Sequence, residues 1–201
     1  MMELDHIAVA GETLEEAVNH VEAALGVPLQ AGGQHQVFGT HNRLLGLADG
    51  LYMEAIAIDP DATPERSPCW FDLDNFSGTP RLTNWICRAT GLPALLESLP
   101  KGAGEPVALT RGDLVWDMAV PADGKLPFDN LFPALIEWHS AHPAPRLDQQ
   151  GCALRRLVIS HPDAANLEEL LPLKDGRLVF ETGTAEMEAE FDTPHGIRVL
   201  R

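Results

Sequence analysis

The feature that most constrains the fold of this chain is a repeated order of strand-like and helix-like segments. A helical segment begins with the capping box of Thr13 and Glu16 and would end at Gly26. Strand-like segments surround this helix at residues 4–10, 37–38, 42–47 and 51–58. The predicted order is therefore β-α-β-β-β. Because the same order begins again at Arg81, the sequence predicts two similar units.

The second unit is predicted over residues 82–140, and a shorter third unit over 152–201. Strands are expected at 83–89, 107–109, 114–120 and 135–139, with a helix at 92–99. In the third unit, a helix would begin at Asp163, between strands at 154–159, 177–181, 187–192 and 197–200. Residues 60–80 are rich in Pro, Asp and Ser and are predicted to be a linker loop. The expected fold is a single α+β domain spanning 1–201, built of units 4–60, 82–140 and 152–201. Its curled mixed sheets would enclose a cleft, with the helices outside.

Composition limits the classes of partner. The net charge is −16, which would repel nucleic acid and anionic membranes, while 45% hydrophobic residues suffice for a core. The N-terminus lacks a signal-peptide pattern, and no apolar stretch is long enough to span a bilayer, so a cytoplasmic location is expected. The predicted cleft suggests a small-molecule ligand. An acidic surface favours cationic ligands in some proteins but in most serves only solubility.

Polar side chains interrupt otherwise apolar strand segments at His6, His41, Asn42 and Glu54. A half-buried strand has little reason to carry such groups unless its face lines a site. His6 and Glu54 offer nitrogen and carboxylate donors that suit Zn, Fe, Mn or Ni. Two plainer readings stay open. His6 could be a buried histidine bonded to the backbone, and Glu54 could lie on an exposed face or pair with an arginine.

Four short motifs resemble the glyoxalase-like domain proteins of the vicinal oxygen chelate superfamily. They are Leu4-Asp5-His6, Gly32-Gly33-Gln34-His35, Gly39-Thr40-His41-Asn42 and Tyr52-Met53-Glu54. The superfamily includes glyoxalase I, extradiol dioxygenases and bleomycin-resistance proteins. The similarity is closest over 4–60 and looser over 82–143 and 152–201.

This resemblance implies a divalent metal (Zn, Ni, Mn or Fe) held by the first and fourth strands of each unit. His6 matches the first-strand ligand and Glu54 the fourth-strand ligand, while Glu137 matches the fourth-strand ligand of the second unit. The other first-strand position falls at residues 84–86, where no strong ligand is present, and Arg156 replaces His6 in the third unit. This incomplete set leaves a cleft without metal open. Glu137 could equally be an acid at the rim of the sheet.

Further side chains are candidates for catalysis or substrate binding. Glu54 is a candidate general base, and His41 a candidate general acid or base because histidine titrates near neutral pH. His41 and Asn42 are adjacent, so only one of them can face the cleft, and Asn42 is a candidate substrate contact. His35 follows a glycine bend and would contact substrate or be a solvated loop residue. Two tryptophans, Trp85 and Trp138, would wall the pocket or belong to the core.

The sequence therefore favours a metal-assisted lyase or isomerase acting on a vicinal-oxygen compound. A dioxygenase is less favoured, because it would need a second strand histidine beside His6. The alternative is a protein of bleomycin-resistance type that binds a small molecule without catalysis. Because units of this superfamily can pair between subunits, a homodimer is also open.

Overall fold

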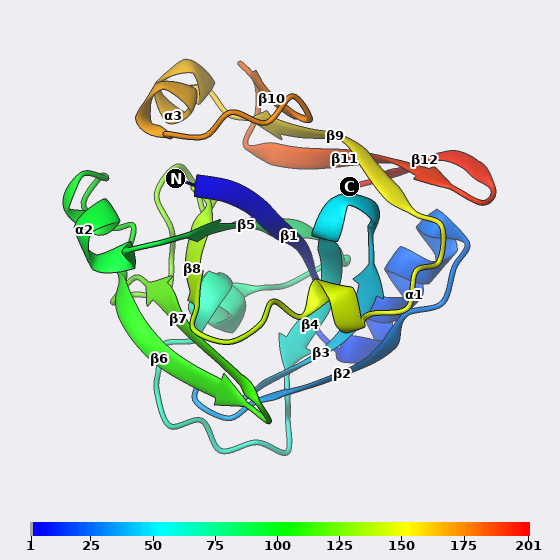
Figure 1. Ribbon diagram of the computed structural model, residues 1–201, viewed down its shortest axis with the longest axis horizontal. Coiled ribbons are helices and arrows are strands. Elements are labelled where there is room, and N and C mark those ends of the chain that lie inside the picture. The colour runs from blue at the N-terminus through cyan, green and yellow to red at the C-terminus, as the bar shows by residue number, and fades with distance from the viewer. Residues whose placement is uncertain (1) are drawn as a thin grey trace.

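A computed structural model describes residues 2–201 and contains two sheets (Figure 1). The larger sheet has eight strands in the order β2-β3-β4-β1-β5-β8-β7-β6, and the smaller has four in the order β10-β9-β11-β12. The eight-stranded sheet curls into a half-barrel, with α1 and α2 outside it (Figure 1). The predicted α+β class is confirmed. No helix among residues 2–201 is both long and apolar enough to cross a membrane.

The first unit forms one half of this sheet. Its elements are β1 (Met2–Ala10), α1 (Leu14–Leu25), β2 (Gln30–His35), β3 (Thr40–Gly46) and β4 (Tyr52–Ile58). The Thr13 side chain accepts from the Glu16 backbone while the Glu16 carboxylate accepts from the Thr13 backbone, so the predicted capping box is present. The helix ends at Gly26, which has a left-handed backbone. Its buried residues Ala17, Val21 and Leu25 pack on the outer face of the sheet.

The second unit repeats this pairing. Its elements are β5 (Arg81–Ala89), α2 (Leu92–Glu97), β6 (Glu105–Arg111), β7 (Leu114–Val120) and β8 (Ala134–Trp138). Within each unit the first strand pairs in parallel with the fourth, as β1 does with β4 and β5 with β8. An antiparallel pairing of β1 with β5 joins the halves. The edge strands β2 and β6 approach one another, which encloses the inner face.

The third segment keeps the order of elements but pairs its strands differently. It contains β9 (Ala153–Ser160), α3 (Ala164–Leu170), β10 (Leu178–Glu181), β11 (Glu186–Thr193) and β12 (Gly196–Leu200). Here the first strand, β9, lies between β10 and β11, whereas β1 pairs with β4. This separate sheet packs outside the half-barrel (Figure 1). There Phe180 contacts Trp85, with ring centroids 6.1 Å apart. It therefore contributes nothing to the inner face.

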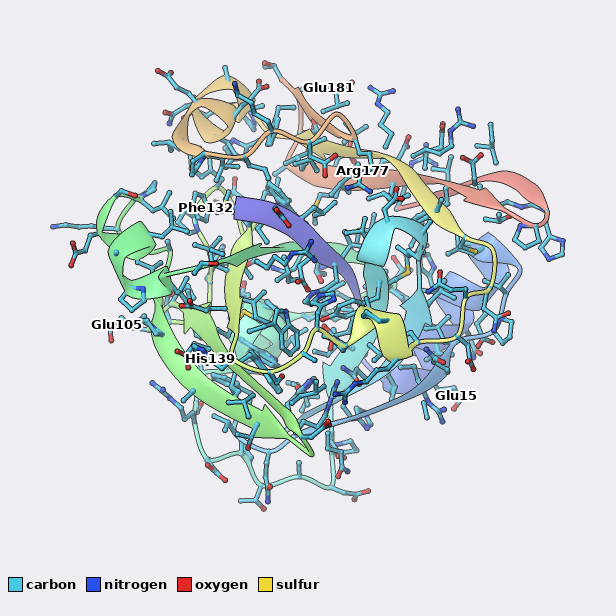
Figure 2. The ribbon with its side chains drawn as sticks, in the orientation of Figure 1. Glu15, Glu105, Phe132, His139, Arg177 and Glu181 are labelled. Atoms are coloured by element: carbon cyan, nitrogen blue, oxygen red, sulfur yellow. The ribbon has the colours of Figure 1, made fainter. Side chains whose placement is uncertain are left out.

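Two local predictions differ from the structure. The second strand is Gln30–His35, whereas Val37 and Phe38 lie in a turn. The glycine-rich strand lacks an apolar pattern and is held by its hydrogen bonds to β3. Residues 60–80, predicted as a linker, contain a short 3-10 helix at Trp70–Asn75, and Trp70 and Phe71 are buried. Charged side chains such as Glu15, Glu105 and Glu181 lie on the outside (Figure 2).

Candidate functional site

The inner face of the half-barrel surrounds a small cavity of about 30 Å³, enough for about one water molecule. Its polar side is formed by His6, His35, Asn42, Tyr52, Glu54 and Arg111. Its apolar side includes Trp70, Phe71, Trp116, Met118, Ile136 and Trp138. Except for Arg111, the polar groups come from the first unit. Apart from Leu44 on β3, the apolar groups come from the second unit and the segment that connects the units.

An irregularity in β1 brings Asp5 beside His6. Leu4 pairs with Cys87 and His6 with Ile86, so Asp5 is the extra residue of a bulge. A bulge breaks the alternation of side chains, which explains why neighbouring residues can meet. Asp5 Oδ1 lies 2.6 Å from His6 Nδ1, and the Asp5 side chain is completely buried. In a regular strand, these two neighbouring side chains would face opposite ways.

The Asp5 carboxylate is the centre of a buried hydrogen-bond network. Its Oδ2 accepts from Trp138 Nε1 at 3.1 Å and lies 2.8 Å from His142 Nε2. Burial alone would raise the pKa of Asp5, but the hydrogen bonds with His142 and His6 outweigh it and hold that pKa below its ordinary value. Asp5 is thus ionised and can only accept hydrogen bonds. The shared proton therefore lies on Nδ1 of His6, which leaves Nε2 facing the cavity.

Glu54 faces His6 across the cavity. His6 Nε2 lies 3.7 Å from Glu54 Oε2, and the His6 ring stacks on Tyr52 with centroids 4.3 Å apart. The other oxygen of Glu54 accepts from Asn42 Nδ2. Burial, followed by the charges of Asp5 and Glu54, raises the pKa of Tyr52 well above its usual value, so Tyr52 is a neutral phenol. The arrangement places two proton-exchanging groups opposite one another in a buried space.

His35 and Arg111 form one end of the cavity. Arg111 Nη1 donates to His35 Nε2 at 3.2 Å, and His35 Nδ1 lies 3.0 Å from Thr40 Oγ1. Burial lowers the pKa of His35 to about 4, with Arg111 adding to the decrease and Glu54 opposing it. His35 is therefore neutral near pH 7. Because Nε2 accepts, Nδ1 carries the proton and donates to Thr40.

The two glycines of β2 make this end possible. A Cβ at Gly32 would come within 2.1 Å of Asn42 Oδ1, and a Cβ at Gly33 within 2.6 Å of Arg111 Cδ. Gly33 N also donates to Asn42 Oδ1 at 2.7 Å. The absence of side chains at both positions therefore lets Asn42 and Arg111 pack against the strand.

Five of the predicted site residues line this cavity. They are His6, His35, Asn42, Glu54 and Trp138. The adjacent pair in β3 is resolved in favour of Asn42. His41 lies on the opposite face, where its Nδ1 is 3.9 Å from Asp59 Oδ2. His41 is thus not brought together with Glu54.

Trp85 and Glu137 also lie away from the cavity. Trp85 is completely buried, and its Nε1 donates to the Leu131 carbonyl at 2.8 Å, so it belongs to the core. Glu137 alternates with the cavity residues Ile136 and Trp138 and faces the other way. Its carboxylate accepts from the backbone N–H groups of Gly91 and Leu92 at 2.7 and 2.8 Å. Glu137 therefore provides hydrogen-bond acceptors for the backbone N–H groups at the start of α2.

The predicted three-ligand metal set is not assembled. Strand register explains this difference between the units. Glu54 lies two residues after Tyr52, the partner of His6, and Ile136 lies two residues after Ala134, the partner of Ile86. The second unit thus presents two isoleucines where the first presents His6 and Glu54. Residues 2–201 contain no group of three His, Cys, Asp or Glu side chains placed to hold a metal. The donor set does not fit a metal held by several protein ligands.

Sequence reasoning missed Asp5, Tyr52, Arg111 and His142 as members of the site. Tyr52 could have been found, because it shares a strand face with Glu54. Asp5 was hidden by the bulge. Arg111 carried no signal, since it closes β6 at a hairpin far from the first unit in sequence. Only the curvature of the sheet brings it to β2 and β3.

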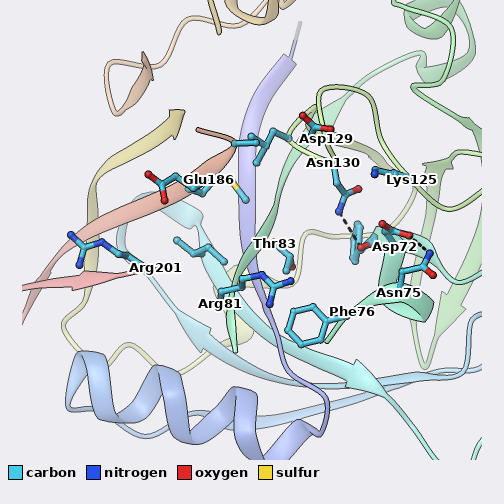
Figure 3. Close-up of a pocket in the computed structure, with 15 residues that line it drawn as sticks. Asp72, Asn75, Phe76, Arg81, Thr83, Lys125, Asp129, Asn130, Glu186 and Arg201 are labelled. Atoms are coloured by element: carbon cyan, nitrogen blue, oxygen red, sulfur yellow. Dashed lines mark hydrogen bonds between the residues drawn. The ribbon is translucent and has the colours of Figure 1, made fainter. Parts of the chain in front are cut away.

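A second hollow lies between β5, β11 and two loops (Figure 3). Its volume is about 300 Å³, and it shares Phe71 with the inner cavity. The Arg81 guanidinium lies over the Phe76 ring, 4.3 Å from its centroid, while Asp72 and Lys125 also line the hollow (Figure 3). None of the predicted site residues lines it.

Comparisons with known proteins agree with this architecture. A hypothetical protein from Staphylococcus aureus has a TM-score of 0.59 at 12% identity, over 92% of this chain and 88% of that chain, which shows a shared fold. Methylmalonyl-CoA epimerase from Mycobacterium tuberculosis has a TM-score of 0.43 at 19% identity, over 69% of this chain and 87% of that chain. The comparison with curated proteins finds no match. Residues 4–173 match the family described as Glyoxalase-like domain. The chain therefore belongs to this glyoxalase-like family.

Proposed function

We propose that this protein is an enzyme that moves a proton on a carbon atom of a small, oxygen-rich substrate. The observation that carries the proposal is the opposition of Glu54 Oε2 and His6 Nε2, 3.7 Å apart in a buried cavity. Asp5 fixes the ring of His6 from behind, an arrangement that catalytic histidines use. A purely structural histidine would not need a free ring nitrogen directed at a carboxylate.

The chemistry follows from the positions of these groups. Glu54 would remove a proton from the carbon beside a carbonyl, and the C–H electron pair would move to the carbonyl oxygen to give an enolate. His6 Nε2 would accept or return a proton at the neighbouring oxygen. Delivery of the proton from Glu54 to the other carbon of the enediolate completes an isomerisation. Alternatively, the enolate electrons re-form the carbonyl and a C=C bond while a leaving group departs from the next carbon with its bonding pair, which completes a lyase reaction. No step is assigned to a metal, because Glu137, the third predicted donor, faces away from His6 and Glu54.

Solvent exchange tests this proposal without a known substrate. Small 2-hydroxy ketones, 2-oxo acids and 2-hydroxy acids would be incubated with protein in D₂O, and loss of the C–H signal followed by NMR. We expect Glu54→Gln to lower the exchange rate about 10²–10⁴-fold, the usual contribution of a general base. Glu137→Gln is the matched control, since it changes a glutamate outside the cavity. Exchange that persists in Glu54→Gln would sink the proposal.

Treatment with a metal chelator tests whether the reaction proceeds without a metal. Exchange by the wild type should survive treatment with EDTA. Exchange that disappears with EDTA and returns with Zn²⁺ or Mn²⁺ would show that a metal takes part in catalysis and would contradict the assignment of no step to a metal.

The second candidate is a binding protein without catalysis. The observation that favours it is the aromatic wall of Trp70, Trp116 and Trp138, which suits retention of a flat ligand. A ligand that binds tightly, but whose C–H protons exchange neither with the wild type nor with Glu54→Gln, would favour this candidate.

A further inference from the structure

Arg111 is the one polar cavity residue that the second unit supplies. It ends β6 and reaches across to the first unit, where Nη1 donates to His35 Nε2 at 3.2 Å and to Asn42 Oδ1 at 3.4 Å. Neither acceptor carries a charge near pH 7, because His35 is neutral there and Asn42 is an amide. Arg111 therefore brings a positive charge into the cavity wall without a carboxylate to neutralise it.

In the part of the chain that the structure describes, the other arginines without an ion pair are exposed, namely Arg43, Arg66, Arg81 and Arg198, whereas Arg111 is half-buried in the cavity wall. There are 30 acidic and 14 basic residues, and arginines such as Arg88, Arg146 and Arg156 form ion pairs with carboxylates at 2.7–2.8 Å. Among residues 2–201, Arg111 has no such ion pair; its hydrogen bonds go to His35 and Asn42. Glu54 is the carboxylate that lines the same cavity, and it accepts from Asn42 Nδ2. The Asn42 side chain therefore links Glu54 to Arg111 without an ion pair between them. The remaining N–H groups of the guanidinium are available to an anion.

Arg111 and His35 also form the boundary with an outer hollow. This hollow has a volume of about 700 Å³ and is lined by both residues, together with Gln34, Thr40, Thr110 and the acidic Asp59 and Asp61. The same two side chains line the inner cavity of about 30 Å³. The route from the larger space to Glu54 therefore passes the guanidinium. The bond from Arg111 to Asn42 is long, at 3.4 Å, so a stronger acceptor can replace it.

We propose that the substrate is a small carboxylate, that it enters from the outer hollow, and that Arg111 binds its carboxylate group. This proposal rests on the proposed function, because it assigns the substrate class of the same site. A planar guanidinium binds a carboxylate through two parallel hydrogen bonds. Displacement of Arg111 from Asn42 would join the cavity to the hollow and place the carbon beside the carboxylate nearer to Glu54. The acidity of the whole chain would favour a cationic ligand, whereas the guanidinium at this end of the cavity, which has no ion pair, favours an anionic group.

Binding to a catalytically disabled protein separates substrate class from catalysis. In the Glu54→Gln background, binding of 2-oxobutanoate, 2-hydroxybutanoate and their neutral amides would be measured by NMR titration and calorimetry. We expect the acids to bind at least 10-fold more tightly than the amides. Adding Arg111→Gln should remove that preference, and Arg111→Lys should retain part of it because lysine keeps the charge but loses the two-bond geometry.

Arg43→Gln is the matched control, since Arg43 is exposed on β3 and does not line the cavity. Circular dichroism would establish that each variant is folded. Acids that bind no better than their amides, acids that do not bind, or a preference unchanged by Arg111→Gln would each overturn the proposal. Binding of acids through Arg111 without C–H exchange in the wild type would retain this inference and reject the proposed reaction. If the protein instead exchanges the C–H proton of neutral substrates and Arg111→Gln does not change that rate, the proposed reaction is retained and the carboxylate inference is rejected.

Discussion

The two halves of the eight-stranded sheet have the same strand pairing and present opposite chemistry to the space between them. At matching registers, the first half presents His6 and Glu54, and the second presents Ile86 and Ile136. The repeated backbone therefore creates the enclosed space, but only one half supplies the proton-exchanging groups. The other half supplies apolar walls that exclude water, which strengthens electrostatic interactions near Glu54. Duplication of a fold unit does not imply duplication of a ligand set.

The largest expected effect comes from making the second half resemble the first. Ile136→Glu would place a carboxylate in an apolar wall without a partner, and we expect it to lower the free energy of unfolding by about 3–5 kcal/mol. The new carboxylate would also complete a three-donor group with His6 and Glu54. Addition of Zn²⁺ or Mn²⁺ should therefore raise the melting temperature of this variant much more than that of the wild type.

Ile136→Gln is the control for the metal effect, because it is polar but adds no charged donor. The metal-dependent rise should also disappear when His6→Ala is added. An equal rise in the wild type would contradict the comparison between the halves, since it would mean that the native donors already hold the ion.

A smaller effect is expected from the pH dependence of the first half. The pKa of His35 is about 4 in the folded protein, against 6.5 for an ordinary histidine. As the pH falls from 6.5 towards 4, the unfolded chain takes up a proton that the folded chain does not, so stability falls with pH in this window. Between pH 7 and 4.5, the wild type should lose about 2 kcal/mol more than His35→Gln, a difference to be measured by urea unfolding. Equal losses in both proteins would show that His35 is not held neutral.

The smallest effect is expected at Glu137, the acid that the metal prediction placed in the second half. Glu137→Ala removes two acceptors from the N–H groups at the start of α2, which should cost about 1 kcal/mol of stability, as loss of a helix cap does. Exchange activity should be unchanged when measured well below the melting temperature. A large loss of activity in this folded variant would indicate that Glu137 reaches the site after all.

Local patterns were sufficient where each residue acts within its own element. The capping box of Thr13 predicted the start of α1, and the repeated element order predicted the α+β class. His6 and Glu54 were found because polar groups in apolar strands are rare without a purpose. The same reasoning favoured His41 over Asn42 as the proton-transferring residue of that pair, whereas Asn42 is the one that lines the cavity. Both positions fit a strand, and only the pairing of β3 with its neighbours sets which side chain faces inward.

By itself, the sequence determined the succession of strands and helices, the existence of two related halves and the pair of residues opposite one another in the cavity. The tertiary structure decided three further points. The bulge at Asp5 overrode strand alternation, curvature brought Arg111 to His35, and register directed Glu137 away from His6. The physical reason is the range of the interactions. Caps and alternation depend on residues a few positions apart, whereas cavities and the charges that line them depend on strands that meet only after the sheet has curled.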